Sequence, residues 1–522
     1  MPCCILCLAP WLIAQPSRQT FRKLRGPKRQ AGRPAGTLAL LRRLEYLLVA
    51  VVLLGFLDTL RFAVYYIPLR FAVNFEEGNV LNAALRITRG QSPYPPVGGL
   101  PYVVNPYGPV FYYAVAPLVK WFGLNFTAPR LLVLASGFAV SLFVILLLKR
   151  WTGSWRIALG FGLSFLAVTL VRDWIYVLRV DIFGAALTMA GLYVFATRRS
   201  PIGSALLFVA GLFTKITLLA APVACIFYLA LSGERRRAWR LTAWMTAFGT
   251  LGLIALGWGT RGWGLFNMFL THPDPYSISR YWNTIRPFAL LDAALLAGAI
   301  ALAARDIRRR QFSLPLLYFL LASVMTLTAG KLGSDANHLI EWQAAMCLAA
   351  GCGYYALRQR PRPDPVVALI PIGIIVLVLL GLPESRQLNP ELQGCQAAYQ
   401  FAAGQPGQLL TGNPGAAVLS GKKVWLSNTF EYAFLGKDGR LDQQPLIRMV
   451  LDKSFGLILI DENIPALEMD AAHPRAANSF WPPGFVAALL QNYHPVARFS
   501  CAYADVAYEP NPPPRPRAVP AR

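Results

Sequence analysis

Long apolar runs separated by short polar loops dominate residues 44–382. A helix needs roughly 20 apolar residues to cross a bilayer, and several of these runs reach that length. The spacing therefore predicts an all-α polytopic membrane protein with about 11 transmembrane helices. We expect them near residues 44–69, 128–148, 157–171 and 180–197, twice within 201–231, and then near 241–257, 286–304, 312–330, 338–357 and 365–382.

Two apolar runs do not fit a single straight crossing. Residues 201–231 are too long for one helix and carry Lys215 near their middle, where a charge in the bilayer is costly. Two short helices that meet at an outer turn remove that cost. Residues 109–122 are too short to cross and are flanked by proline and glycine, so we predict an interfacial helix within a long first exoplasmic loop, 70–127.

The charge distribution sets the orientation. The chain contains 50 Lys plus Arg against 25 Asp plus Glu, although only 14% of its residues are charged. The basic residues lie in short loops between apolar runs, not on one face of one domain. This is the positive-inside pattern, so the charge indicates topology and contact with anionic lipid and argues against nucleic-acid binding. It predicts a basic cytoplasmic tail at 1–43, an exoplasmic C-terminus, and a multi-pass location in the plasma (inner) membrane.

Residues 383–508 have a different pattern. Short β-rich runs such as QLLTG, AAVLSG and GLILIDE alternate with helix-like pieces such as 443–453, which predicts a small exoplasmic α/β domain. Cys395 and Cys501 both lie in this region and are candidates for a disulfide if it faces an oxidising compartment. The proline-rich residues 509–522 are predicted to be a disordered tail.

With this topology, the unusual polar residues of the apolar region gather on the exoplasmic side. They include Glu76, Glu77, Arg179, Asp181, Lys215, Lys331, Asn337 and Glu341. Convergence of ionisable groups on one membrane face indicates a functional site. Each group also has a structural interpretation, as a helix cap, an ion pair, a snorkelling lysine or a hydrogen bond between helices. Because no histidine cluster has the spacing of metal ligands, no metal or other cofactor is predicted.

Carboxylates and cations at a bilayer surface suit glycosyl transfer from a lipid phosphate. A carboxylate deprotonates or orients an acceptor hydroxyl, and Lys or Arg stabilises a phosphate leaving group. Aromatic residues of the first loop, such as Tyr94, Tyr102 and Tyr107, suit a sugar site at headgroup level. The alternative is a lipid or glycolipid transporter or flippase, whose polar residues should occur at both ends of a path through the bilayer.

The order of several short motifs resembles the GT-C superfamily of integral membrane glycosyltransferases, near its protein mannosyltransferase and aminoarabinose transferase group. The resemblance covers residues 44–460 or thereabouts. Its motifs are Glu76-Glu77-Gly78, Asn105-Pro106-Tyr107-Gly108-Pro109, Arg179-Val180-Asp181, Thr214-Lys215, and Gly330-Lys331-Leu332-Gly333 followed by Asn337 and Glu341. The first acid of the family's loop is usually Asp, whereas here the pair is Glu-Glu, which leaves open which glutamate is the base.

The resemblance implies an inverting hexosyltransferase that uses a polyprenyl-phosphate-linked sugar donor and an exoplasmic acceptor. Some members use a divalent metal and others do not, and none is predicted here. The implied catalytic residues are Glu77, which we favour as the base, and Glu76. The implied donor phosphate ligands are Lys215, Arg179 and Lys331, and the orienting residues are Asp181, Asn337 and Glu341. The implied acceptor or sugar contacts are Tyr94, Tyr102, Asn105 and Tyr107.

Overall fold

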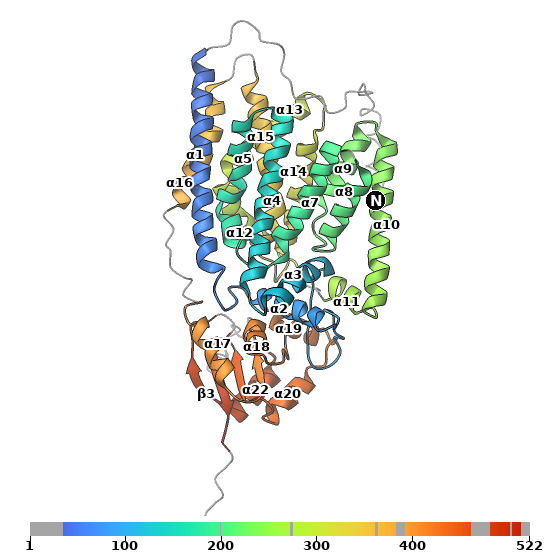
Figure 1. Cartoon of the computed structure of the whole chain (residues 1–522), viewed down its shortest axis with the longest axis vertical. Coiled ribbons are helices and arrows are strands. Elements are labelled where there is room, and N and C mark those ends of the chain that lie inside the picture. Colours follow the sequence, from blue (N-terminus) through green and yellow to red (C-terminus); the bar gives the residue numbers. More distant parts are fainter. Residues whose placement is uncertain are drawn as a thin grey trace, which may run out of the picture.

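A long bundle of helices carries a smaller α/β domain at one of its ends (Figure 1). The structure is a computed structural model, and it describes residues 35–198, 200–271, 275–360, 364–382, 392–460, 481–501 and 504–512. Most of the predicted N-terminal tail, and residues 513–522 of the predicted C-terminal tail, lie outside these ranges. Residues 35–43 belong to the first helix, so the helix begins earlier than the predicted boundary at residue 44.

The bundle and its outer loops contain sixteen α-helices among the described residues. They are α1 (Ala35–Tyr66), α2 (Phe75–Thr88), α3 (Pro109–Phe122), α4 (Thr127–Thr152), α5 (Trp155–Ala167), α6 (Thr169–Trp174), α7 (Val180–Arg198), α8 (Pro201–Leu212), α9 (Ala220–Leu231), α10 (Arg235–Gly259), α11 (Trp263–Phe269), α12 (Ile278–Leu291), α13 (Ala293–Arg308), α14 (Leu314–Met325), α15 (Ile340–Arg358) and α16 (Leu369–Gly381). Three 3-10 helices accompany them: η2 (Thr326–Gly330), η3 (Ala336–Leu339) and η4 (Pro365–Ala368).

Several of these helices are suited to a bilayer. Within the described ranges, α1, α4, α7 and α10 are each long and apolar enough to cross a membrane, and shorter apolar helices occur at α5, α8, α9, Leu314–Gly330 and Pro365–Gly381. The interfacial segment 109–122 forms α3, and the run 201–231 breaks into α8 and α9 on either side of Lys215. The count of about 11 crossings stays a prediction.

The predicted straight span 286–304 is not formed. The chain bends by 89° between α12 and α13. Asp292 occupies the junction and Pro287 lies inside α12, and both a charge and a proline interrupt a regular apolar helix. Helix α12 has no buried residue, and it runs beside η2, where Ser277 N donates to Gly330 O at 2.9 Å.

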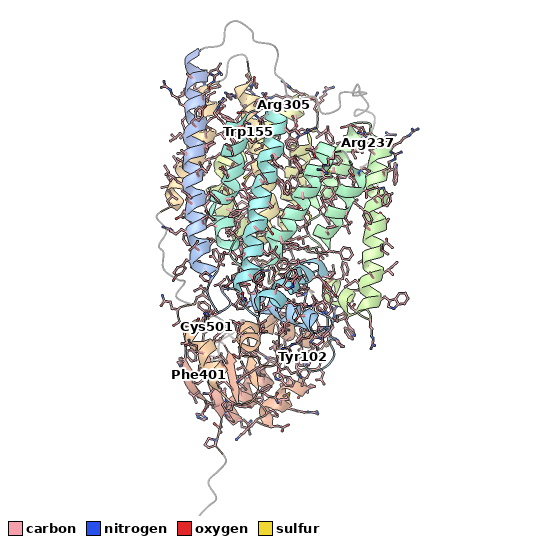
Figure 2. The ribbon with its side chains drawn as sticks, in the orientation of Figure 1. Tyr102, Trp155, Arg237, Arg305, Phe401 and Cys501 are labelled. Carbon is pink, nitrogen blue, oxygen red and sulfur yellow. A yellow bond between two sulfur atoms is a disulfide. The ribbon has the colours of Figure 1, made fainter. Side chains whose placement is uncertain are left out.

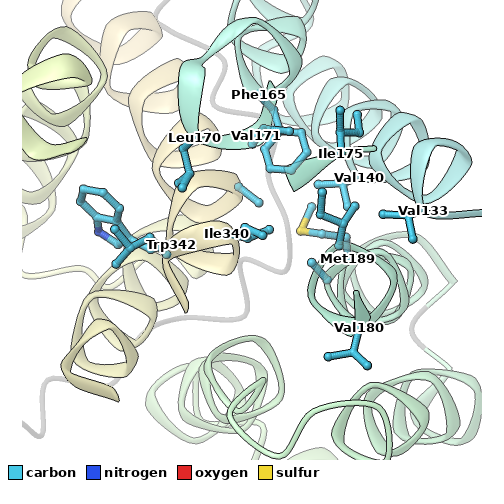
Figure 3. Close-up of a cluster of buried hydrophobic side chains, with 14 of the residues drawn as sticks. Val133, Val140, Phe165, Leu170, Val171, Ile175, Val180, Met189, Ile340 and Trp342 are labelled. Atoms are coloured by element: carbon cyan, nitrogen blue, oxygen red, sulfur yellow. The ribbon is translucent and has the colours of Figure 1, made fainter. Parts of the chain in front are cut away.

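The core of the bundle lies among α4, α5, α6, α7 and α15 (Figure 3). Val140, Phe165 and Met189 meet there and are fully buried. Helix α15 is buried over most of its length and packs closely against α13. A Cβ atom on Gly353 would lie 2.0 Å from the carbonyl oxygen of Gly298, so this approach requires glycine.

The two ends of the molecule differ in charge and structure. Figure 2 shows Arg237 and Arg305 at the end of the bundle that is far from the α/β domain, and Tyr102 and Cys501 at the other end. The basic loops and the α/β domain are therefore on opposite sides of the bundle. This separation agrees with the sides that the positive-inside pattern predicts for them.

The outer α/β domain contains a four-stranded sheet in the order β1-β2-β4-β3. Its strands are β1 (Leu409–Thr411), β2 (Leu457–Ile460), β3 (Tyr493–Arg498) and β4 (Val506–Pro510), and its helices are α17 (Cys395–Gly404), α18 (Pro414–Leu419), α19 (Thr429–Lys437), α20 (Gln444–Leu451) and α22 (Pro483–Asn492). Strand β1 is parallel to β2, and β4 is antiparallel to both of its neighbours. Cys395 and Cys501 form a disulfide.

Two details of the α/β domain differ from the sequence expectation. The AAVLSG run forms α18 instead of a strand, because Asn413 and Pro414 start a helix there. The chain continues as strand β4 through Pro510, beyond the predicted boundary at residue 508, because β4 completes the sheet between β2 and β3.

Candidate active site

The first outer loop docks onto the turn that carries Lys215. Gly108 N donates to Thr214 O at 3.2 Å, and Val110 N donates to Phe213 O at 3.2 Å. A Cβ atom on Gly108 would lie 1.9 Å from the oxygen of Phe213, so only glycine allows this contact. The glycine of the Asn-Pro-Tyr-Gly-Pro motif therefore fixes where Tyr107 lies relative to the α8–α9 turn.

Asp181 lies at the centre of a charged cluster at the outer end of the bundle. Its side chain is buried in the first turn of α7. Lys215 Nζ lies 2.5 Å from Asp181 Oδ1, and Arg179 Nε lies 3.3 Å from Oδ2. Asn337 Nδ2 donates to Oδ1 at 2.8 Å. The structure thus brings together four predicted residues from three separate segments, and two cations face one carboxylate.

Arg179 connects this cluster to the first outer loop. Its Nη2 donates to the Tyr107 hydroxyl at 2.7 Å, and its Nη1 donates to Asn74 Oδ1 at 3.2 Å. The same Asn74 oxygen accepts from Glu76 N at 3.1 Å and caps α2. The guanidinium also lies over the Trp174 ring, 5.2 Å from its centroid. These contacts fix the guanidinium beside the start of α2.

Electrostatics keep Arg179 cationic and Tyr107 neutral. Burial lowers the pKa of Arg179, but Tyr107, Asp181 and Glu76 raise it more, so the pKa lies above its ordinary value. Burial also raises the pKa of the Tyr107 hydroxyl, Arg179 lowers it, and the carboxylates of Glu76, Asp181 and Glu431 raise it again. The net shift is upward, so Tyr107 is able to donate as well as accept a hydrogen bond at neutral pH.

The Glu77 carboxylate is held by hydrogen bonds and an ion pair within the protein. Its carboxylate forms a fully buried ion pair with Arg130, whose Nε and Nη2 donate at 2.8 and 2.7 Å. Backbone N–H groups of Val73 and Leu178 also donate to it, each at 2.7 Å. Arg130 in turn donates to four carbonyl oxygens, those of Tyr66, Ile67, Leu69 and Phe71. Both carboxylate oxygens of Glu77 are therefore occupied by donors from within the structure.

Glu76 is the glutamate that interacts electrostatically with the cluster. It is buried in the first turn of α2, and Asn79 Nδ2 donates to its Oε2 at 3.3 Å. Its charge acts on both Arg179 and Tyr107. The sequence favoured Glu77 as the base with Glu76 as its partner, whereas the internal contacts of Glu77 favour Glu76 for that role.

A small cavity with about 330 Å³ of empty space adjoins the cluster. Asp181, Lys215, Asn337 and Glu341 all line it. The Asn337 amide oxygen has no hydrogen-bond partner among the described residues, although it is buried. Glu341 Oε1 accepts from Ala221 N, in the first turn of α9, at 3.3 Å. The cavity therefore presents a cation, carboxylates and an unused acceptor to whatever enters it.

The remaining predicted residues lie elsewhere. The hydroxyl of Tyr94 donates to Tyr107 O at 2.7 Å, Tyr102 donates to Asp442 O in the outer domain, and the Asn105 side chain donates to Pro93 O. All three side chains are buried in these internal contacts. Lys331 is exposed, with no ion pair or hydrogen bond from its ammonium group to another described residue. Of the four predicted acceptor contacts, only Tyr107 belongs to the cluster.

The outer domain supplies a carboxylate that sequence reasoning missed. Glu431 is buried in the first turn of α19, and its charge acts on Tyr107. The preceding segment pairs with the first outer loop, since Ser427 Oγ both accepts from Val104 N and donates to Val104 O. Asn428 caps α19 by accepting from Glu431 N, and an Asn-x-x-Glu pattern signals such a helix start. Proximity to Tyr107 has no signal in the sequence.

Arg130 was also missed, although a signal was available. It is a basic residue at the outer end of an apolar helix, against the positive-inside pattern, and such a charge needs a partner. Among the described residues, no group of three or more His, Cys, Asp or Glu side chains is arranged to hold a metal ion.

Comparison with solved structures identifies the fold. ArnT from Cupriavidus metallidurans bound to undecaprenyl phosphate is similar with a TM-score of 0.59 over 88% of this chain and 97% of that chain, at 13% sequence identity. The apo state of the same protein gives a TM-score of 0.60, again over 88% of this chain and 97% of that chain. The apo Archaeoglobus fulgidus oligosaccharyltransferase gives 0.55 over 86% of this chain and 73% of that chain, at 11% identity. This chain has the GT-C fold.

The likeness to the GT-C proteins is one of fold. No protein-family model and no curated protein sequence matches the chain. The fold that the motifs predict agrees with this likeness, which extends over 97% of the ArnT chain.

Proposed function

We propose that this protein is a membrane glycosyltransferase that moves a sugar from a polyprenyl-phosphate-linked donor to a hydroxyl-bearing acceptor on the exoplasmic side. One observation carries the proposal: Lys215 and Arg179 converge on Asp181 beside a cavity at the outer end of a GT-C fold. We place the protein in the plasma (inner) membrane, with the basic loops in the cytoplasm and the outer domain outside.

The donor phosphate would bind at the cation cluster. Lys215 lines the cavity and Arg179 contacts the same Asp181 carboxylate, so both cations would lie close to a phosphate bound there. Exposed Lys331 would meet the phosphate from the rim. The fold supports this class of lipid, because ArnT is solved bound to undecaprenyl phosphate and the archaeal oligosaccharyltransferase AglB in complex with an inhibitory peptide and a dolichol-phosphate.

Glu76 would act on the acceptor. In the proposed inverting displacement, the acceptor oxygen bonds to the anomeric carbon as the bond from that carbon to the phosphate oxygen breaks. The phosphate leaves with the bonding electron pair and is stabilised by Lys215 and Arg179. The hydroxyl proton passes to the Glu76 carboxylate. Tyr107 holds Arg179 in place by accepting from its Nη2.

Asp181, Asn337 and Glu341 would orient the site. Asp181 keeps both cations in position, since its two oxygens contact one each. Asn337 anchors the η3 segment to Asp181 and leaves its amide oxygen available to a sugar hydroxyl. Glu341 fixes the start of α9, next to the turn that carries Lys215.

The test is glycan transfer by membranes that carry single variants, measured by mass analysis of envelope glycans. We expect Lys215→Met and Glu76→Gln each to lower the transfer rate roughly 100-fold or more. Lys120→Met and Glu234→Gln are matched controls, because both residues are distant from the cluster, Lys120 on an exposed part of α3 and Glu234 in an exposed ion pair. Normal transfer by both site variants would refute the assignment. Lipid flux in vesicles without any sugar transfer would refute the proposed function in favour of a transporter.

A further inference from the structure

His338 is an ionisable residue of the cavity beside Asp181 that the proposed transfer does not use. It lies in the short helix η3 and lines the cavity together with Lys215. The preceding residue, Asn337, donates to Asp181 Oδ1 at 2.8 Å. The backbone that carries the imidazole is therefore tied directly to the charged cluster.

A contact with Thr328 determines which ring nitrogen of His338 carries the hydrogen. His338 Nδ1 lies 2.7 Å from Thr328 Oγ1. The Thr328 hydroxyl group has a single hydrogen, which it donates to Met325 O at 2.8 Å. The hydrogen between Thr328 and the ring must then belong to Nδ1. In the neutral ring, Nε2 therefore carries a lone pair and accepts hydrogen bonds.

The second ring nitrogen of His338 is left for a ligand. The contact with Thr328 is the one hydrogen bond that the His338 side chain makes within the described ranges. Burial and the charge of Lys215 both disfavour a positive charge on the ring. Because the ring stays neutral, Nε2 is an acceptor and not a donor.

The amide oxygen of Asn337 is a second acceptor at the same cavity. The Asn337 residue is 3% exposed, and this oxygen has no hydrogen-bond partner among the described residues. Two acceptors from consecutive residues suit a ligand group that donates, because a buried acceptor without a donor is costly. A phosphate group offers mainly further acceptors, whereas a sugar hydroxyl group donates. The η3 side of the cavity therefore suits the sugar, and the Lys215 side suits the phosphate.

The wall next to η3 is apolar. Trp342 and Ile340, at the start of α15, both line the cavity (Figure 3). The indole N–H of Trp342 donates to Ser323 Oγ at 3.1 Å, so the ring contributes apolar surface to the wall. Apolar surface beside two acceptors matches a sugar ring, which has C–H groups on its faces and hydroxyl groups at its edge. A sugar carboxylate does not match, because it carries a charge and has no hydrogen to donate.

We propose that His338 recognises the transferred sugar by accepting a hydrogen bond at Nε2 from one of its hydroxyl groups. This inference rests on the proposed glycosyl transfer, and it defines the donor as a neutral sugar in which that hydroxyl group is free. Thr328 is a positioning residue, because it holds the hydrogen of the ring on Nδ1. A sugar without that hydroxyl group leaves Nε2 unpaired and is rejected.

The test measures kcat/KM for transfer by the full-length protein in membranes. Geranylgeranyl-phosphate-linked mannose, glucose, galactose and arabinose are offered first, and the best donor is then compared with its singly deoxygenated forms. We expect one deoxygenation to lower kcat/KM of the parent roughly tenfold, the effect of one good hydrogen bond. His338→Phe should be roughly tenfold poorer with the complete donor and insensitive to that same deoxygenation.

Two further variants separate recognition from proton transfer and from folding. His338→Gln should recover most of the rate and the sensitivity, because an amide oxygen accepts the same hydrogen bond but is not a base at neutral pH. His494→Gln, on the exposed part of β3, is the matched control and should transfer like the parent. If His338→Phe melts well below the parent, Thr328→Val replaces it in the comparison. Loss of the Thr328 oxygen lets the ring hydrogen move to Nε2, so the effect of the deoxygenation should shrink.

The possible failures are distinguishable. A parent protein that transfers none of the four sugars would contradict the proposed function itself. A parent that transfers, with every deoxygenation affecting the parent, His338→Phe and Thr328→Val equally, would overturn the inference alone. So would a His338→Gln protein that melts normally but is as inactive as His338→Phe, because that result indicates proton transfer at the ring.

Discussion

The different roles inferred for the adjacent residues Glu76 and Glu77 can be tested by one pair of substitutions. Glu77→Gln and Glu76→Gln are chemically identical changes, one residue apart on α2. Because Glu77 is locked to Arg130 and Glu76 lies toward Arg179, we expect the first to damage stability and the second to damage transfer. The two outcomes separate a positioning residue from a base.

The expected loss for Glu77→Gln follows from its hydrogen bonds. Each carboxylate oxygen of Glu77 accepts once from Arg130 and once from a backbone N–H, of Val73 or Leu178. An amide replaces one of these oxygens by a donor. One N–H of Arg130 and one backbone N–H then face another donor, and the guanidinium loses its buried counter-charge. Breaking a buried pair in this way costs about 3–5 kcal/mol.

The assay compares melting temperature with transfer per folded molecule for detergent-purified protein. Arg130→Lys serves as a companion to Glu77→Gln, because an ammonium group cannot form the same fork to Glu77 and reach the carbonyls of Tyr66 and Phe71. We expect both to melt several degrees lower, while Glu76→Gln stays near the parent and loses transfer. A Glu77→Gln protein that melts normally but transfers nothing would refute the positioning role.

Three further predictions follow from individual contacts. Tyr107→Phe removes the acceptor of the Arg179 hydrogen bond, so transfer should fall roughly tenfold with the melting temperature unchanged, as measured on the same purified protein. Gly78→Ala places a Cβ atom 2.2 Å from the Gly415 nitrogen, so α18 should separate from α2 and limited proteolysis should release the outer domain. Cys395→Ser opens the disulfide to Cys501 and should destabilise that domain by about 2–5 kcal/mol in denaturant unfolding, with Cys225→Ser as a control that leaves it unchanged.

The sequence predicted those features that depend on the bilayer alone. The cost of a charge at mid-membrane placed Lys215 in a turn, and residues 109–122 form a separate short helix as predicted, whereas its interfacial position stays a prediction. The bend at Asp292 was missed, because a single polar residue in an apolar run is consistent with either a continuous or a broken helix. Short runs such as AAVLSG are ambiguous between helix and strand for the same reason, and Pro414 decided that case.

The candidate site was predicted in part. Asp181, Arg179, Lys215 and Asn337 converge because each ends or begins a helix on the same side, which topology alone implies. Contacts between residues that are far apart in the sequence could not be predicted from it. Glu77 meets Arg130 from 53 residues away, and the choice between Glu76 and Glu77 depended on that contact. The sequence also could not separate site tyrosines from structural tyrosines in the first loop. A tyrosine at headgroup level has the same sequence pattern whether its hydroxyl group faces a sugar or a buried carbonyl oxygen.

The attachment of the outer domain to the first loop has a consequence for biogenesis. Tyr102 N donates to Trp425 O and Ser427 N donates to Tyr102 O, and the ring of Phe430 would be 3.1 Å from a Cβ atom on Gly333. These contacts join residues 425–430 to two loops that lie about 100 and 320 residues earlier in the chain. The bundle is synthesised first, and its outer loops gain these contacts only when residues 425–431 have folded against them. A chain that is inserted in the membrane but not yet finished therefore lacks the contacts that hold the first outer loop in place.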